Sequence, residues 1–260
     1  MAEPIGTVTG PGGIRVDEIG VGPRVVLVHG GGAPGFGAFE AQLPLAARWR
    51  LVAPHRFGFA GSPDRPEDWE IDAPVVAELL GDGAHLVGAS YGGTVALLAA
   101  ARRPEAVRSL TLVEPSAISI AMDDPVVIEF ERETRAALAL PEPGDALRSL
   151  FSAVDPAATW PDPLTPPLEE LGRRLQNMRL PQDAVYDAGT LAGGGFPIVV
   201  VTGGDRPPFE SIAAALVREL GARHLVIAHG PHGTQHLGAP FNDLVERVWR
   251  DADAASSPPA

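Results

Sequence analysis

Cysteine is absent from the 260 residues of this chain. Disulfide bonds, thiolate metal sites and cysteine nucleophiles are therefore excluded. Lysine is absent as well, so all 20 basic residues are arginines, a bias that we interpret as ancestry rather than as a binding device. The net charge is −13 and the arginines form no run, which argues against a nucleic-acid partner because a phosphate-binding surface needs clustered cations.

Long hydrophobic runs are also lacking. No stretch approaches the ~18 apolar residues of a membrane-spanning helix, and the N-terminal sequence MAEPIGTVTG has neither the basic start nor the apolar core of a signal peptide. We therefore expect a cytoplasmic protein with no membrane partner. Hydrophobic residues make up 45% and charged residues 20%, which predicts an ordinary globular protein, most simply one domain with an insertion.

Glycine and proline bound a series of short apolar runs along the chain. Runs rich in Val, Ile and Leu without polar alternation are typical of strands that are covered on both faces. We predict such strands at residues 24–30, 50–54, 85–90, 109–115, 197–204 and 223–230.

Helical segments of crossover length lie between these runs. Alternating strands and helices predict a doubly wound, mostly parallel α/β sheet, in which sites form outside the carboxyl ends of the strands. The predicted helices are residues 39–48, 75–80, 94–102, 209–220 and 241–250.

One long segment interrupts the alternation. Residues 115–192 contain no clear strand, but they contain helical stretches joined by proline-rich sequence. We interpret the segment as a helical cap or lid over the site, the alternative being a helical decoration with no role there. The predicted core is then residues 1–114 and 193–250, followed by a disordered tail at 251–260. Candidates for an apolar pocket are Phe36, Phe57, Phe59, Met122, Phe130, Phe151 and Trp160.

Ser90 lies in Gly88-Ala-Ser-Tyr-Gly92, directly after a predicted strand and before an apolar helix. A nucleophile on a sharp strand-to-helix turn needs small neighbours, because the strained backbone leaves no room for side chains. The alternative is a turn serine that merely caps the following helix. The context favours a nucleophile, with the Tyr91 N–H at the helix start facing the position of an oxyanion.

A glycine-rich loop follows the first long predicted strand. The sequence His29-Gly-Gly-Gly32 lets the backbone approach a substrate closely and present an N–H group. We predict that the Gly31 N–H forms the second half of an oxyanion hole with Tyr91, rather than that the loop is simply flexible.

The chain resembles the α/β-hydrolase fold family across nearly its whole length. HGGGAPG, beginning at His29, is similar to the oxyanion loop of esterases and of carbon–carbon bond hydrolases that act on ring-cleavage products. RFGFAGS, beginning at Arg56, is similar to the RGxGxS turn of the family, and GASYGG is similar to its nucleophile elbow. The resemblance implies an α/β-hydrolase core with a serine nucleophile.

The resemblance also implies a catalytic base after the last strand, where three histidines occur. His232 fits best, since it follows a Gly-Pro turn and precedes a sequence that resembles the terminal helix of the family; His236 and His229 remain alternatives. The other four histidines lie at or near strand termini, and we interpret them as structural: His29, His55, His85 and His224.

Two carboxylates are candidates for the acid that orients this base. Most family members carry the acid after the seventh strand, where Asp205 occurs, but the usual register from Pro197 puts Arg206 at that place. Some relatives use a glutamate at the end of the sixth strand, which matches Glu114. Either would fix the tautomer of the imidazole and stabilise the imidazolium. We leave both open, with Glu114 slightly favoured.

No metal or cofactor site is predicted. The spacing of His229, His232 and His236 resembles a zinc motif, but Gly230, Pro231 and Gly233 forbid a regular helix there. No phosphate-binding loop or dinucleotide fingerprint occurs.

The predicted function is that of a serine hydrolase acting through an acyl-enzyme on a small ester, lactone or related carbonyl compound. One alternative, suggested by HGGGAPG, is a carbon–carbon bond hydrolase or other tailoring enzyme of the same fold. Another is a binding protein that has kept the fold without the chemistry. Its best support is that Asp205 does not fall in the usual register of the acid. The expected partner is a small-molecule substrate, and the protein is expected to be a monomer or homodimer.

Overall fold

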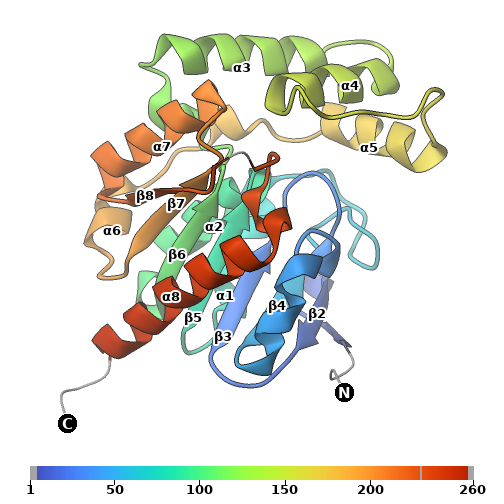
Figure 1. Ribbon diagram of the computed structural model, residues 1–260. Coiled ribbons are helices and arrows are strands. Elements are labelled where there is room, and N and C mark those ends of the chain that lie inside the picture. The colour runs from blue at the N-terminus through green and yellow to red at the C-terminus, as the bar shows by residue number, and fades with distance from the viewer. Residues whose placement is uncertain (1–4, 229, 257–260) are drawn as a thin grey trace.

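The computed structural model describes residues 5–228 and 230–256 and confirms the predicted fold class. Eight strands form one sheet in the order β1-β2-β4-β3-β5-β6-β7-β8 (Figure 1). β2 pairs antiparallel with β1 and β4, and all the other pairs are parallel. The strands are β1 (Gly6–Thr9), β2 (Arg15–Ile19), β3 (Arg24–Val28), β4 (Arg50–Pro54), β5 (Ala84–Ala89), β6 (Val107–Val113), β7 (Ile198–Thr202) and β8 (Arg223–Val226).

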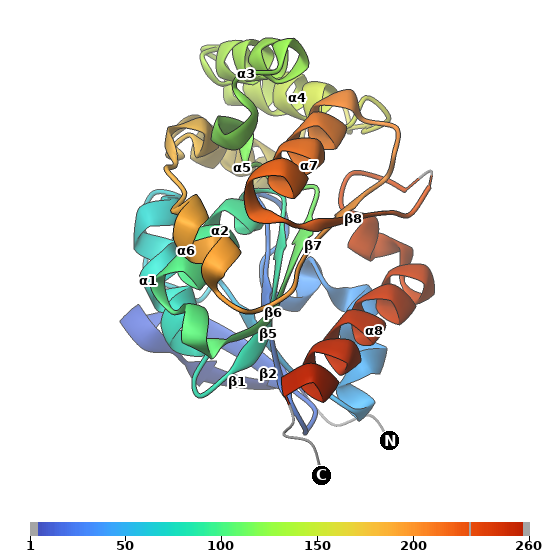
Figure 2. The ribbon, with the colours of Figure 1, turned by 90° about the vertical axis from the view of Figure 1, so that its left-hand side faces the viewer.

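Helices cover both faces of the sheet, as Figure 2 shows with the sheet seen nearly edge-on. α1, α2, α6 and α7 lie on one side, and α8 and the 3-10 helix η3 lie on the other. The α-helices are α1 (Trp69–Leu79), α2 (Tyr91–Arg102), α3 (Pro125–Leu138), α4 (Pro143–Val154), α5 (Pro166–Gln176), α6 (Ala188–Gly193), α7 (Pro207–Leu220) and α8 (Ala239–Ser256). The 3-10 helices are η1 (Pro11–Gly13), η2 (Gly35–Gly37), η3 (Glu40–Ala47), η4 (Pro104–Ala106), η5 (Ile118–Ala121), η6 (Pro181–Asp183) and η7 (Thr234–Leu237).

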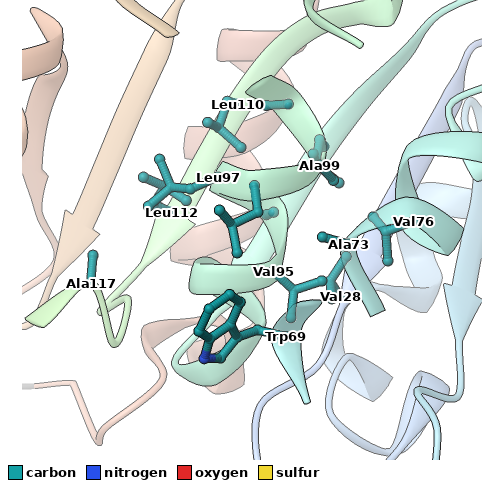
Figure 3. Packing of buried hydrophobic residues seen from close by; sticks show 14 of the residues in the cluster. Val28, Trp69, Ala73, Val76, Val95, Leu97, Ala99, Leu110, Leu112 and Ala117 are labelled. Carbon is teal, nitrogen blue, oxygen red and sulfur yellow. The ribbon is translucent and has the colours of Figure 1, made fainter. Parts of the chain in front are cut away.

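Side-chain alternation divides the core into two layers. In β3, Val26 and Val28 face the layer of α1 and α2, whereas Val25 and Leu27 face α8. Figure 3 shows the first layer from close by, with Leu97 of α2 beside Leu110 and Leu112 of β6, and Val95 near Ala73 and Val76 of α1. Burial of both faces explains the unbroken apolar runs.

Several elements differ from the prediction for identifiable reasons. β1 and β2 have no counterpart among the predicted strands, because GTVT and RVDEI are not apolar runs. The predicted helix at 39–48 is the 3-10 helix η3, which contains Pro44, a residue that cannot donate in an α-helix. α1 begins six residues before the predicted start at 75, since the Asp68 side chain accepts the N–H of Glu70 and caps it.

The predicted disordered tail at 251–260 is wrong for its first part. α8 continues to Ser256, because alanine is the best helix former and Ala252 is 4% exposed, packed against the sheet. Residues 257–260 lie outside the described residues.

Residues 115–187, here called the cap, form the helices α3, α4 and α5 between β6 and β7. These helices lie beyond the carboxyl ends of the strands, at the top of Figure 1. The cap has an apolar cluster of its own that includes Ala137, Leu147 and Leu175. The predicted segment ended at 192, but α6 packs against α2 and α7 of the core. None of the helices in the described ranges combines the length and apolar character needed to cross a bilayer.

Candidate active site

Ser90 occupies a strained turn between β5 and α2. Its backbone has φ 51° and ψ −122°, a conformation that residues with a side chain rarely adopt. A Cβ at Gly92 would lie 2.2 Å from the Val28 carbonyl oxygen, and one at Gly88 would lie 2.4 Å from the Gly92 carbonyl oxygen. The glycines of the motif are therefore required by the close approach of three backbone segments.

His232 reaches the serine from the loop after β8. Its Nε2 lies 3.1 Å from Ser90 Oγ, within hydrogen-bond distance. The ring also packs against Phe209, with 4.8 Å between ring centroids, which limits its orientation. His236 lies nearby in η7, where burial first and the charge of His232 second lower its pKa. The third candidate, His229, lies outside the described residues.

Glu114 completes a line of three polar side chains. It follows β6 directly, has a φ of 39°, and its side chain is fully buried. Its Oε2 lies 3.0 Å from His232 Nδ1, although the ring N–H approaches off-line for a hydrogen bond. Such contacts are often poorly aligned until substrate binds.

Two backbone N–H groups also hold the Glu114 carboxylate. Gly203 donates to Oε1 at 3.0 Å and Gly233 donates to Oε2 at 2.8 Å. Burial raises the pKa of Glu114, but the proximity of His232 and these two donors outweigh it, and the pKa lies below its ordinary value. The carboxylate is therefore ionised at neutral pH.

Asp205, the other candidate acid, is not brought to the imidazole. Its side chain is 45% exposed and pairs with Arg206 at 3.0 Å. Within the described residues, Asp205 makes no ion pair with His232. Arg206 instead lies on the inner side, with its Nη1 3.6 Å from Glu114 Oε1.

Hydrogen bonds from two side chains fix the glycine loop after β3. The Gly30 carbonyl accepts Arg56 Nη2–H at 2.9 Å and the Nδ1–H of His29 at 2.8 Å. Burial, followed by the charge of Arg56, lowers the pKa of His29 well below its ordinary value, so the ring is neutral. Because a trans peptide directs its C=O and N–H to opposite sides, the Gly31 N–H points away from Arg56.

Tyr91 begins α2 directly after Ser90, and its hydroxyl makes two hydrogen bonds to the backbone of other segments. Its hydroxyl accepts the Trp69 N–H at 3.1 Å and donates to the Arg179 carbonyl at 2.9 Å. The N–H of Tyr91 is one of the free donors at the amino end of α2. The hydroxyl thus links the helix start to the segment that returns from the cap.

A pocket of about 260 Å³ lies between the glycine loop, Ser90 and the cap. Of the predicted apolar candidates, Phe130 and Phe151 line it, and Trp160 packs on Phe151 with ring centroids 5.1 Å apart. The others lie elsewhere: Phe36, Phe57 and Phe59 are buried in the core, and Met122 is 40% exposed. The cap residues that line the pocket are mainly apolar, namely Ser116, Ile118, Phe130, Thr134, Leu138, Leu150, Phe151, Val154, Leu175, Met178, Pro181 and Gln182.

Three residues at the site were not predicted from sequence. Ser116 Oγ lies 3.5 Å from Ser90 Oγ, and Arg206 and Asp155 surround the loop of His232. One sequence signal pointed to Arg206: the usual register of the family, counted from Pro197, puts Arg206 at the place of the acid. Residues 5–228 and 230–256 contain no group of His, Asp and Glu side chains arranged to hold a metal ion.

The described part of the chain places the four structural histidine candidates away from Ser90 Oγ. His55 Nε2 lies 2.8 Å from Asp17, His85 Nδ1 lies 2.8 Å from Ser109 Oγ, and His224 Nε2 lies 2.8 Å from Thr202 Oγ1. His29 supports the glycine loop as described above.

Among curated relatives, a pimeloyl-[acyl-carrier protein] methyl ester esterase of Aeromonas salmonicida is 36% identical over 115 residues, which cover 43% of this chain and 45% of the relative. A 2-hydroxy-6-oxo-2,4-heptadienoate hydrolase of Pseudomonas putida is 35% identical over 134 residues, covering 46% and 48%. The chain thus spans less than half the length of the curated relatives it matches.

Solved structures match over far more of the chain but at lower identity. N-acyl homoserine lactonase AidH complexed with N-butanoyl homoserine has a TM-score of 0.70 at 20% identity, covering 99% of both chains. An esterase from Thermogutta terrifontis has a TM-score of 0.67 at 20% identity, covering 96% of this chain and 99% of the other. These likenesses show the fold. The family model for the alpha/beta hydrolase fold matches residues 23–197, and the chain therefore belongs to that family.

Proposed function

We propose that this protein is a serine hydrolase in which Ser90, His232 and Glu114 act as nucleophile, base and acid. The observation that carries the proposal is the line of contacts from Ser90 Oγ to His232 Nε2 at 3.1 Å and from His232 Nδ1 to Glu114 Oε2 at 3.0 Å. Its support is geometric, because Ser90 and His232 line one pocket and the buried Glu114 lies behind the imidazole.

Acylation begins when Ser90 Oγ attacks the carbonyl carbon of the substrate. His232 Nε2 takes the hydroxyl proton, and the ionised Glu114 keeps the other ring proton on Nδ1 and stabilises the imidazolium. The N–H groups of Gly31 and Tyr91 bind the oxyanion of the tetrahedral intermediate. The C–O bond then breaks, and the proton on Nε2 goes to the leaving alcohol.

Deacylation repeats these steps with water as the nucleophile. His232 Nε2 removes a proton from the water as its oxygen attacks the acyl carbon. Collapse of the second tetrahedral intermediate breaks the bond to Ser90 Oγ, which recovers its proton from the imidazolium. The products are a carboxylic acid and an alcohol, and for a lactone both groups remain in one hydroxy acid.

The proposed substrate is a neutral ester or lactone with an apolar acyl group. The cap side of the pocket is lined mainly by aliphatic and aromatic side chains, and the lining residues in the described part of the chain include no arginine, aspartate or glutamate. Burial of an apolar acyl chain there is favourable by about 0.8 kcal/mol per methylene. A dienoate, the substrate class named for the Pseudomonas putida relative, carries a carboxylate that would find no arginine among those lining residues.

The direct test is covalent labelling with a fluorophosphonate, followed by measurement of the intact mass. We expect one adduct on the wild type and none on Ser90→Ala. Ser116→Ala is the matched control, because its hydroxyl lies 3.5 Å from that of Ser90, whereas among the described residues it is Ser90 Oγ that hydrogen-bonds His232. That variant should still take up one adduct.

Labelling at another residue, or no labelling of a folded wild type, would overturn the assignment and favour a binding protein that has kept the fold without the chemistry. If labelling succeeds, turnover of p-nitrophenyl butyrate and of a vinylogous diketone should be compared. Faster turnover of the diketone would favour the carbon–carbon bond hydrolase over the esterase.

A further inference from the structure

One guanidinium joins three segments behind the imidazole. Arg206 immediately precedes α7, and its side chain is only 11% exposed. Nη1 donates to the Gly230 carbonyl at 2.9 Å and lies 3.6 Å from Glu114 Oε1, while Nη2 donates to Asp155 Oδ1 at 3.2 Å. Arg206 therefore contacts the histidine loop, the buried acid and the cap at once.

Asp155 makes the corresponding contacts from the cap. It ends α4, and its side chain is 15% exposed. Oδ2 accepts the backbone N–H of His232 at 3.1 Å, while Oδ1 accepts Arg206 Nη2–H. The cap thus binds directly to the residue whose ring lies against Ser90.

Both groups of this pair are charged at neutral pH and are shielded from solvent. Burial raises the pKa of Asp155, but the hydrogen bond from the His232 N–H and the proximity of Arg206 outweigh this effect, so the pKa lies below its ordinary value. Hydrogen bonds between charged groups are among the strongest in proteins, and little solvent screens this one. Neither residue lines the pocket, so neither is placed to touch the substrate.

Resting on the proposed function, we propose that Arg206 and Asp155 are positioning residues that couple the seating of the cap to the assembly of the triad. With the cap seated, Asp155 fixes the His232 backbone and Arg206 ties the Gly230 carbonyl beside Glu114. With the cap raised, the His232 N–H and Arg206 Nη2 lose Asp155 as their acceptor, so the cap no longer holds the His232 backbone. The imidazole is then free to leave the line between Ser90 and Glu114.

The chain offers a matched control for an ordinary link between core and cap. Arg218, on the helix α7 that follows Arg206, pairs with Asp123 of the cap at 3.3 Å. Its side chain is 52% exposed and that of Asp123 is 71% exposed, and neither lines the pocket. This pair joins the same helix to the cap without contacting His232 or Glu114.

The test measures the rate at which a fluorophosphonate labels Ser90 as a function of pH, so it needs no knowledge of the substrate. The charged and titratable groups around the imidazole are Glu114 after β6, Arg206 before α7, Asp155 after α4, His236 in η7, and Asp205 beyond Arg206. Labelling fails at low pH where the base is protonated, which defines the acidic limb of the profile.

Arg206→Gln and Asp155→Asn should move the acidic limb of the pH profile in opposite directions. Arg206→Gln removes a cation, which favours protonation of the base and moves the limb up by about 0.5 pH unit. Asp155→Asn removes an anion and moves it down by a similar amount, and the double variant lies between. Each single variant should also lower the plateau rate about tenfold, because the imidazole is less well positioned. Arg218→Gln and Asp123→Asn should change neither quantity.

A purely structural role would slow labelling without shifts of opposite sign. Shifts in the same direction, no shift, or equal effects in the Arg218 and Asp123 variants would overturn the inference. Should Arg206→Gln fail to fold by circular dichroism, Arg206→Lys replaces it: the retained charge keeps the limb in place, while the plateau falls because an ammonium cannot span both partners. A lysine variant with the wild-type plateau overturns the inference, and a wild type that does not label overturns the proposed function itself.

Discussion

The carboxylate of Glu114 lies 3.0 Å from Nδ1 of His232, although nearly half of the chain separates Glu114 from the histidine loop. The backbone of Glu114 has a φ of 39°, so the strand ends in a left-handed residue that turns this side chain beneath the loop. Such strain in a residue with a side chain persists only where the surroundings hold it, here through Gly203 and Gly233.

Replacement of each carboxylate should show that Glu114, and not Asp205 in the loop after β7, acts on the imidazole. Glu114→Gln should lower kcat about a thousandfold, because a neutral amide cannot stabilise the imidazolium or fix its tautomer. Asp205→Asn should change kcat by less than about threefold, since its carboxylate is exposed and pairs with Arg206 rather than with His232. Steady-state hydrolysis of p-nitrophenyl butyrate measures both. Equal and mild effects would contradict the triad with Glu114.

The elbow glycines should be intolerant of any side chain. In Gly92→Ala, the new Cβ would lie 2.2 Å from the Val28 carbonyl oxygen, and neither backbone segment can move without displacing β3 or α2. We expect a loss of about 3 kcal/mol in the free energy of unfolding, measured in urea. Gly193→Ala is the control, because no atom lies within 4 Å of its new Cβ. Equal stabilities for the two variants would refute this explanation of the motif.

Glu246, in the first half of α8, supplies a prediction about stability and pH. Glu246 accepts hydrogen bonds from Arg48 at 2.6 Å and from Trp49 Nε1 at 3.0 Å. The Arg48 hydrogen bond is the main cause that lowers the pKa of Glu246 from 4.5 to about 2. A carboxyl group with a lowered pKa in the folded state stabilises the fold above pH 4.5, and this contribution disappears as the pH falls toward 2.

Glu246→Gln should therefore cost about 1–2 kcal/mol at pH 7, a modest value because the Arg48 side chain is 56% exposed and screened by solvent. The difference from the wild type should shrink between pH 5 and pH 3 in urea unfolding experiments. Glu105→Gln removes a surface pair and should cost less than about 0.5 kcal/mol at any pH. A pH-independent deficit in Glu246→Gln would show that packing, not charge, is responsible.

The pocket should select acyl chains by length. Phe151→Ala opens space on the cap side, so the preferred p-nitrophenyl ester should become longer, with a gain of about fourfold in kcat/KM per added methylene. Leu138→Phe fills space and should shift the preference to shorter chains. Val185→Ala, whose parent side chain is 84% exposed, should leave the series unchanged. Unaltered preferences in both pocket variants would place the acyl group elsewhere.

Motifs that depend on adjacent residues could be read directly from the sequence. The strand, Gly88-Ala-Ser-Tyr-Gly92 and the following apolar helix predict a strained elbow, because only small residues fit where backbones meet. The runs at residues 24–30 and 197–204 predict strands buried on both faces, and β3 (Arg24–Val28) and β7 (Ile198–Thr202) lie within them. Local chemistry suffices for these features.

The sequence alone determined the fold class and a serine at an elbow, and it reduced the candidates for a catalytic base to three histidines and those for the acid to two carboxylates. It could not choose between Glu114 and Asp205, because β6 and β7 are neighbours whose carboxyl ends bring both residues to one edge of the sheet. Only the tertiary structure decides which side chain turns inward. It alone also brings Asp155 of the cap to the backbone of His232, 77 residues away, since no local pattern encodes a contact made when two separately folded layers close on each other.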